Sequence, residues 1–185
     1  MADELNGRRI AVLVAQGVEQ VELEEPRRAL EAAGATTVLL SVPDGVQDGT
    51  VQAVNGDIHP GDAFPVAGMV ADASVDDFDG LLLPGGAVNP DTLRQDADAL
   101  AFVTGFMDGG KPVAAICHAP WTLLEAGTLD GRTLTSYPSI RGDLRRGGAT
   151  VLDQEVVRDG NLVTSRDPDD LPAFCAAAVE LFAGR

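Results

Sequence analysis

At 185 residues and a formal net charge of −16, the chain is long enough for one sizeable core and too short for two ordinary domains with a linker. The excess of 29 acidic over 13 basic residues repels phosphate backbones and anionic membranes, so neither nucleic acid nor a membrane is an expected partner. Two cysteines and two histidines are too few for a disulfide framework or a convincing zinc site, and we expect no metal. We predict one domain over residues 1–185, and the acidic start, unlike a secretory signal, favours the cytoplasm.

The first half of the chain alternates apolar runs of strand length with a helical pattern. Residues 9–15 form a continuous apolar run, typical of a strand buried on both faces of a parallel sheet. Residues 19–33 place apolar side chains among charges at helical spacing, and residues 36–42 form a strand rich in β-branched residues. Residues 44–79 are irregular, and we expect a small hairpin or insert there with a short helix near 75–78.

The second half repeats the strand and helix pattern with short connections. Residues 89–109 predict one long helix, with Asn89 as its N-cap and Pro90 in its first turn. The other predicted helices cover 120–127, 138–146 and 168–182, and the predicted strands cover 80–83, 113–116, 132–134, 149–152, 155–158 and 162–165. Repeated units of this kind imply an α/β fold with a mostly parallel sheet covered on both faces.

The stretch 111–124 predicts a buried strand that turns sharply at Cys117 and enters a helix at Pro120. A side chain at such a corner projects from the carboxyl end of the sheet, where open α/β folds bind ligands. A tight turn requires small residues two before and two after the cysteine, and here both are alanines where glycines are more usual. The first helical amides favour a thiolate. Cys117 is therefore the candidate nucleophile, whereas Cys175 is expected to be a plain core residue.

The elbow residues 115–120, Ala-Ile-Cys-His-Ala-Pro, resemble the nucleophile elbow of the ThiJ/PfpI superfamily. Further segments that resemble the superfamily in order are residues 17–23, 83–86, 135–141 and 162–166, and with residues 167–172 they are most similar to its stress-protein and PfpI branch. The resemblance implies a flavodoxin-like three-layer sandwich with a cysteine nucleophile elbow. It also implies a homo-oligomer, either a dimer or a hexamer.

The same resemblance singles out Glu22 as the carboxyl that reaches the elbow sulfur. A carboxyl buried beside a thiolate should have a raised pKa, so Glu22 could act as a general acid and base. From the residues alone, the other glutamates of this helix are equally good candidates for a solvated helix face. Gly85 and Gly86 follow a buried strand and Tyr137 resembles a residue lining the family's pocket, so these three are expected in the oxyanion hole or substrate pocket.

His118 and Asp91 are the remaining candidates for catalysis. The backbone amide of His118 is well placed to join that of Gly86 in an oxyanion hole, but a contact between its ring and Cys117 is not assured at a corner. Asp91 follows Pro90 at the position where PfpI proteases are thought to supply an acid to a neighbouring subunit. Its alternative role is to interact with the helix dipole.

Three functions fit these residues. The first is a cofactor-free stress-protection enzyme of the glyoxalase or protein-deglycase type, acting on methylglyoxal or its protein adducts through Cys117. The second is a PfpI-like intracellular cysteine peptidase or amidase, acting on a peptide or protein with His118 as base. The third is a redox-sensing or chaperone-like stress protein whose reactive sulfur is oxidised by peroxide.

Overall fold

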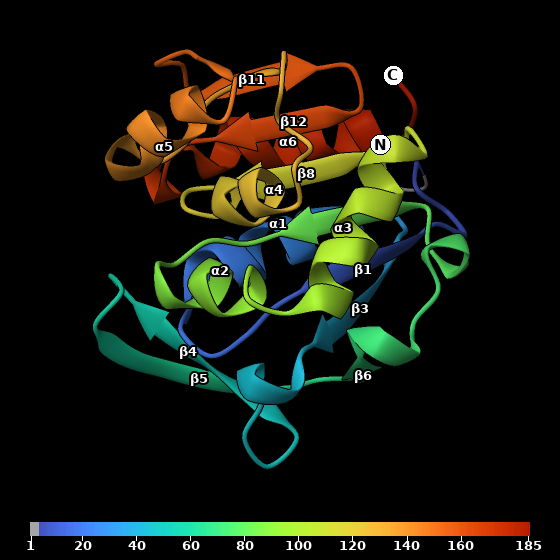
Figure 1. Ribbon diagram of the computed structural model, residues 1–185. Coiled ribbons are helices and arrows are strands. Elements are labelled where there is room, and N and C mark those ends of the chain that lie inside the picture. Colours follow the sequence, from blue (N-terminus) through green and yellow to red (C-terminus); the bar gives the residue numbers. More distant parts are fainter. Residues whose placement is uncertain (1–3) are drawn as a thin grey trace.

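The continuous apolar runs of the sequence form the central strands of a seven-stranded sheet. The computed structural model describes residues 4–185, and the first three residues of the predicted domain lie outside that range. The strand order is β11-β12-β8-β7-β1-β3-β6, and every neighbouring pair is parallel except β11 with β12 (Figure 1). The strands are β1 (Arg9–Leu13), β3 (Thr36–Ser41), β6 (Gly68–Met69), β7 (Gly80–Leu83), β8 (Val113–Ile116), β11 (Val156–Asp159) and β12 (Leu162–Ser165).

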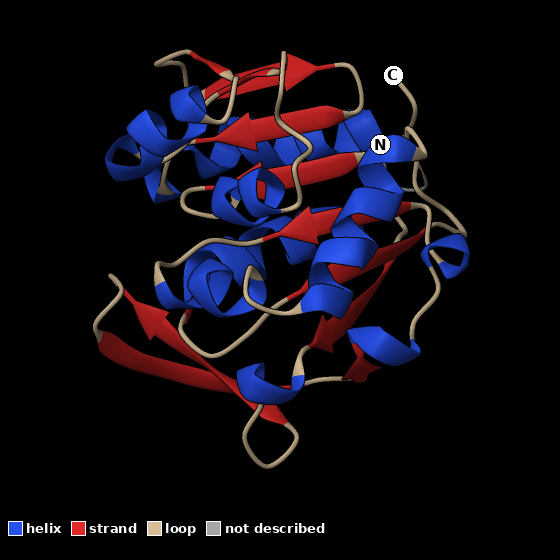
Figure 2. Cartoon of the chain, in the orientation of Figure 1, coloured by secondary structure: helices blue, strands red, loops and turns tan. Residues whose placement is uncertain are grey.

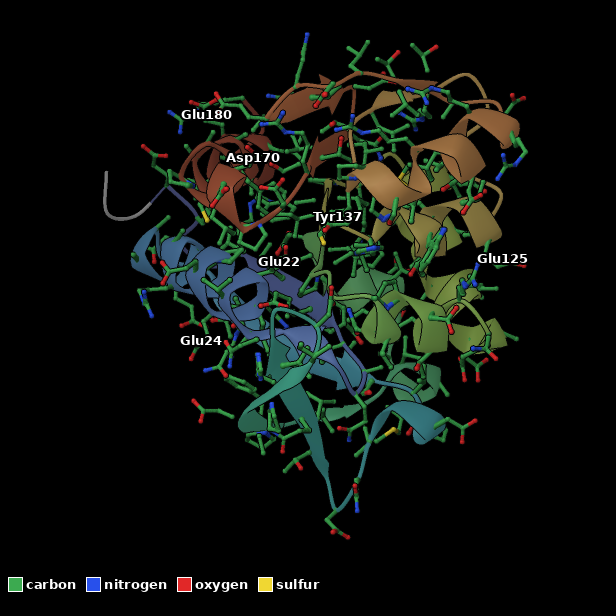
Figure 3. The ribbon with its side chains drawn as sticks, turned by 90° about the vertical axis from the view of Figure 1, so that its left-hand side faces the viewer. Glu22, Glu24, Glu125, Tyr137, Asp170 and Glu180 are labelled. Atoms are coloured by element: carbon green, nitrogen blue, oxygen red, sulfur yellow. The ribbon has the colours of Figure 1, made fainter. Side chains whose placement is uncertain are left out.

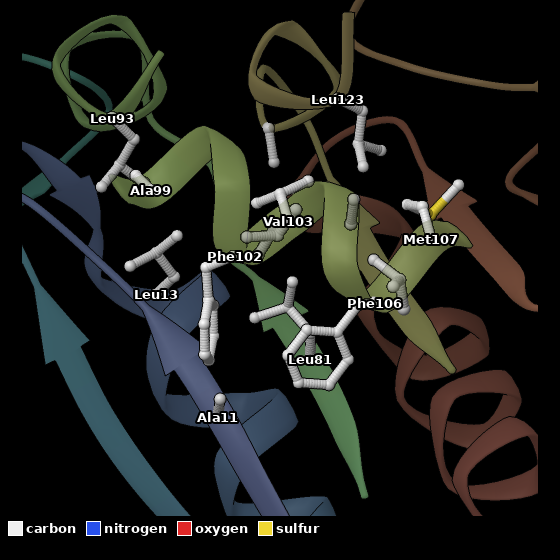
Figure 4. Close-up of a cluster of buried hydrophobic side chains, with 14 of the residues drawn as sticks. Ala11, Leu13, Leu81, Leu93, Ala99, Phe102, Val103, Phe106, Met107 and Leu123 are labelled. Carbon is white, nitrogen blue, oxygen red and sulfur yellow. The ribbon is translucent and has the colours of Figure 1, made fainter. Parts of the chain in front are cut away.

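Helices cover both faces of this sheet, as Figure 2 shows. On one face lie α1 (Gln20–Ala32) and α6 (Leu171–Phe182), and on the other α2 (Val88–Leu93), α3 (Ala97–Asp108), α4 (Pro120–Glu125) and α5 (Arg141–Arg146). Alternate residues of β1 serve the two faces, because side chains of a strand point to opposite sides: Ala11 and Leu13 pack with Phe102 and Phe106 of α3 (Figure 4). Ile10 packs against the α1 and α6 side. The predicted three-layer sandwich is confirmed.

The predicted irregular insert forms a hairpin beside the main sheet. β4 (Thr50–Asn55) and β5 (His59–Pro65) pair antiparallel, and β2 (Val18–Glu19) adds to β4 in parallel. The short helix expected near 75–78 is a 3₁₀ turn at Val75–Asp77. A second small sheet pairs β9 (Thr133–Leu134) with β10 (Thr150–Val151). Within residues 4–185 there is no helix with the length and apolar character needed to cross a membrane.

The single long helix predicted over 89–109 is wrong, since the chain forms α2 and α3 with a break between them. Asn89 does not cap α2. Its buried side chain instead accepts from the amide of Ala15 at 2.6 Å and donates to the carbonyls of Pro84 and Gly85 at 2.9 and 3.0 Å. The real cap is Asp96, whose carboxylate accepts from an amide of α3. An asparagine whose side chain makes three hydrogen bonds to backbone groups outside the helix cannot also cap the helix that it appears to begin.

Candidate functional site

Cys117 occupies a left-handed backbone conformation between β8 and α4, as the elbow pattern requires. Its φ angle is 65°, a region that a residue with a Cβ enters at a cost of about 1–2 kcal/mol. Hydrogen bonds hold the turn from both sides: the Cys117 amide donates to the carbonyl of Ser165 at 3.1 Å, and its carbonyl accepts from Tyr137 at 2.9 Å. The sulfur is therefore fixed at the carboxyl edge of the sheet, with only 5% of the residue exposed.

Glu22 reaches the sulfur from α1 and is fully buried. Its Oε2 accepts from the amide of Gly85 at 3.0 Å, its buried Oε1 has no hydrogen-bond partner among residues 4–185, and the carboxyl lies beside the Cys117 side chain. The space is so tight that a Cβ on Gly85 would lie 2.5 Å from the Cβ of Cys117 and closer still to Oε2. Burial, and secondly the charge of Glu19, raise the pKa of Glu22 from 4.5 to about 8. Figure 3 labels Glu22 and Tyr137 near the middle of the molecule.

The protonation state of Cys117 differs from the sequence-based expectation of a freely formed thiolate. Burial and the Glu22 charge raise the pKa of the Cys117 thiol, although the amides of Gly86 and His118 donate to Sγ and act in the opposite direction. Because a carboxylate and a thiolate in contact would repel each other, the proton lost near pH 8 belongs to the Glu22 and Cys117 pair. A thiolate at this sulfur is therefore favoured only while Glu22 holds its proton.

The His118 ring does make the contact with the sulfur that the sequence could not assure. Its Nδ1 lies 3.2 Å from Sγ of Cys117, its Nε2 lies 3.0 Å from Oγ of Ser139, and the ring stacks on Tyr137 at a centroid distance of 4.4 Å. Burial lowers the pKa of His118, which favours the neutral ring at pH 7. A neutral imidazole donates from one nitrogen and accepts at the other, so the Ser139 hydroxyl influences whether Nδ1, which faces the sulfur, carries the proton.

The glycine loop, residues 84–87, follows β7, and three of its consecutive amides donate to three side chains from different elements. The amide of Gly85 donates to Glu22, that of Gly86 to the elbow sulfur, and that of Ala87 to Oδ1 of Asp57 at 2.8 Å. Gly86 has a φ of 83°, and a Cβ there would lie 2.8 Å from the amide nitrogen of Glu19 and closer still to a backbone carbonyl oxygen. Glycine is therefore required by both conformation and space.

The sequence of residues 8–181 matches the model of the DJ-1/PfpI family. The chain belongs to the DJ-1/PfpI family. It is 40% identical over 174 residues to the Bacillus subtilis protein named putative cysteine protease YraA, covering 94% of this chain and 98% of that one. It is 42% identical over 174 residues to B. subtilis general stress protein 18, covering 91% and 94% of the two chains.

Solved structures of the DJ-1/PfpI family share the fold. Drosophila melanogaster DJ-1beta superposes with a TM-score of 0.83 at 28% identity, covering 100% of this chain and 92% of that one. A two-domain protein from Anabaena variabilis with DJ-1/ThiJ/PfpI-like and ferritin-like domains gives a TM-score of 0.85 at 33% identity. That match covers 94% of this chain and 47% of the two-domain chain.

Asp91, the acid suggested by the PfpI branch of the family, lies away from the sulfur of its own chain on the outer side of α2. Its carboxylate pairs with Arg94, with Nη2 at 2.6 Å and Nε at 2.9 Å, and its side chain is 48% exposed. The Arg94 guanidinium in turn lies 4.8 Å above the ring of Trp121. A role for Asp91 in a neighbouring subunit stays a prediction.

Cys175 is half-buried on α6 rather than a fully enclosed core residue. It lines a groove with Ala29 and Ala32 of α1, and burial raises the pKa of its thiol to about 11. No group of three or more potential metal ligands occurs within residues 4–185. Sequence reasoning did not single out Ser139 and Asp57 and gave Asn89 a different role, because each makes a hydrogen bond across more than 20 positions, which no local pattern signals.

Proposed function

We propose that this member of the DJ-1/PfpI family is a cysteine-dependent stress-protection enzyme of the glyoxalase or protein-deglycase type. Its substrate would be methylglyoxal or the adducts that methylglyoxal forms on proteins. The observation that carries the proposal is the fully buried carboxyl of Glu22 beside the Cys117 side chain, where its raised pKa lets it hold or release a proton. A peptidase requires a base that deprotonates its nucleophile, whereas proton transfer between adjacent carbons requires one carboxyl that gives and takes protons within the same site.

The reaction balances with the groups present. The Cys117 thiolate adds to the aldehyde carbon of methylglyoxal, forming a C–S bond, and the oxygen takes the proton of Glu22 to give a hemithioacetal. Glu22, now a carboxylate, removes the proton from that carbon to give an enediol, and the hydroxyl proton of this carbon passes to the oxygen of the neighbouring carbonyl. Glu22 then returns its proton to the neighbouring carbon, whose oxygen is now a hydroxyl. The product is a lactoyl thioester, and water cleaves its C–S bond to release lactate and restore the thiol.

The surroundings of the sulfur support this sequence of steps. The amides of Gly86 and His118 are directed at Sγ, so they could also donate to an oxygen on a carbon bonded to it. A pKa near 8 allows Glu22 to be protonated when the thiolate attacks and to accept a proton afterwards.

Lactate formation from methylglyoxal by the purified protein tests the proposal. Wild-type protein and Cys175→Ser, which keeps the elbow intact, should both form lactate, whereas Cys117→Ala should form none. Glu22→Gln should keep the thiol but lose at least about 100-fold in kcat, because no other carboxyl replaces its proton transfer. Equal turnover by Cys117→Ala would overturn the proposal, as would the absence of lactate with the wild-type protein.

A cysteine peptidase or amidase is the second candidate, and the 3.2 Å distance between Nδ1 of His118 and Sγ favours it. The name of the 40% identical relative, putative cysteine protease, points the same way. In this case His118 would deprotonate Cys117, whose sulfur would attack the peptide carbonyl carbon and become acylated. The peptide amine would leave with the proton that His118 had taken up. Cleavage of casein or of fluorogenic peptides by wild-type protein and Cys175→Ser, but not by Cys117→Ala, would support it. Cleavage that survives in Cys117→Ala would exclude it.

A further inference from the structure

The tip of the β4–β5 hairpin is fastened to the body of the protein beside the glycine loop. The buried carboxylate of Glu19 accepts from the amides of Gly56 and Asp57 at 2.9 and 3.1 Å. Asp57 takes a left-handed conformation with a φ of 65°, and its residue is exposed. The tip therefore has a fixed position, although it consists of exposed residues.

From this position the Asp57 carboxylate faces the sulfur site. Its Oδ1 accepts from the amide of Ala87, and the preceding amide, that of Gly86, donates to Sγ of Cys117. Because neighbouring Cα atoms are about 3.8 Å apart, this chain of contacts places the carboxylate within roughly 10 Å of Sγ. Burial has the larger effect on the pKa of Glu22, Cys117 and His118, and the charge of Asp57 acts on all three in the direction of a higher pKa.

Within residues 4–185 the Asp57 carboxylate forms no salt bridge, and its hydrogen bond comes from a backbone amide. Arg94 lies on the α2 side above Trp121, where it is already paired with Asp91. The carboxylate of Glu19, which holds the tip, adds a second acidic group behind Asp57. An anion approaching the sulfur would therefore meet unfavourable potential, whereas an uncharged or cationic molecule would not.

We propose that Asp57 is a specificity-determining residue, which disfavours anionic substrates at Cys117 and so favours uncharged or cationic carbonyl compounds. The substrate class rests on the proposed function, whereas the charge selectivity at the sulfur does not. Methylglyoxal is uncharged, and its adducts on lysine and arginine side chains carry no negative charge, so both belong to the favoured class. Carboxylate-bearing aldehydes such as glyoxylate belong to the disfavoured class.

Two alkylating reagents of similar size measure this selectivity without any turnover. Cys117 in a Cys175→Ser background is treated with uncharged iodoacetamide or anionic iodoacetate, and the ratio of the two rates is divided by the same ratio for N-acetylcysteine. The ratio cancels any change in thiolate fraction, because that fraction affects both reagents equally. We expect wild-type protein to prefer iodoacetamide more strongly than the free thiol does.

Asp57→Asn is the informative variant, because asparagine keeps the acceptor for the Ala87 amide and tolerates the left-handed conformation. It should reduce the normalised preference for iodoacetamide by about 2- to 15-fold. This range is the effect of removing one charge at about 10 Å when the effective dielectric constant lies between about 80, as in water, and about 20, as near a protein surface. Asp108→Asn, at the exposed end of α3, makes the same change in net charge and should leave the ratio unchanged. Added salt should weaken the wild-type preference.

An unchanged ratio in Asp57→Asn, or an equal change in Asp108→Asn, would overturn the inference. The two proposals fail separately. If Asp57→Asn changes the ratio but wild-type protein forms no lactate, the charge selectivity stands and the proposed reaction does not. If wild-type protein forms lactate and Asp57→Asn leaves the alkylation ratio unchanged, the proposed reaction is supported and Asp57 does not determine its substrate specificity.

Discussion

Replacing Glu22 by glutamine should remove a large part of the pH dependence of the free energy of unfolding. Burial first, and the Glu19 charge second, raise the pKa of Glu22 from 4.5 to about 8. The folded protein therefore keeps a proton that the unfolded chain releases between these pH values. For an acid with a raised pKa, stability is greatest below the unfolded pKa and is lost as pH rises through the folded pKa.

The size of the effect follows from the same interval. At about 1.4 kcal/mol per pH unit, the range from 4.5 to about 8 gives an upper bound of about 5 kcal/mol. Sharing of the proton with Cys117 and relaxation around a buried charge reduce this, so we expect about 2–4 kcal/mol between pH 5 and pH 8. Glutamine has nearly the same shape as glutamate, stays neutral, and can still accept from the amide of Gly85. The free energy of unfolding of Glu22→Gln should therefore not show this decrease between pH 5 and pH 8.

Urea unfolding followed by circular dichroism at pH 5, 6, 7 and 8 measures the difference. The wild-type midpoint should fall relative to that of Glu22→Gln as pH rises, with equal m-values showing that the same surface unfolds. Glu24→Gln, on the same helix, makes the same charge change at a half-buried position and serves as the matched control. If the difference between wild type and Glu22→Gln is constant across this range, Glu22 titrates normally and the reasoning about its burial fails.

Three further substitutions test the frame around the site. Gly85→Ala forces a methyl group against Glu22 and the elbow sulfur, so alkylation of that sulfur and thermal stability should both change, with a loss of about 2 kcal/mol or more in a urea titration. Asn89→Ala leaves one amide and two carbonyls without their partner and should cost about 3–5 kcal/mol by the same measurement; a loss under about 1 kcal/mol would contradict its bracing role. Ser139→Ala frees Nε2 of His118 and should lower kcat about 5-fold and change the pH profile of alkylation, with Ser139→Thr restoring both; a profile identical to wild type would show that the hydroxyl does not orient the ring.

The order of strands and helices was largely predictable, because the central strands are continuous apolar runs and the helices end at glycines. The break between α2 and α3 was not, because it depends on Asn89 bonding to Ala15, 74 positions away. A side chain that looks like a cap in the sequence is used by the tertiary structure instead. Propensity describes what a residue does locally, and it has no access to such a competing partner.

The nucleophile was predictable from the elbow, since small residues around Cys117 allow a turn that few other patterns explain. Its protonation was not, because the effect of burial and of Glu22 on the pKa outweighs that of two amides. Glu22 itself could be chosen only by the family resemblance, since Glu19 is also buried but holds the hairpin tip. Glu19 and Glu22 are three positions apart, and they differ in the groups that their carboxylates contact. Glu19 accepts from the hairpin tip, whereas Glu22 accepts from Gly85 beside the sulfur.

The hydrogen bond from the amide of Cys117 to Ser165 links the elbow to a strand that is made late in translation. β12 flanks β8 in the finished sheet, so a nascent chain that has emerged only as far as α4 has neither the neighbouring strand nor the carbonyl that fixes the turn. Because residue 165 lies in the last fifth of the chain, the hydrogen bond that holds the elbow can form only after most of the polypeptide has been synthesised. The conformation of the nucleophile therefore depends on a contact that the N-terminal four fifths of the chain cannot supply.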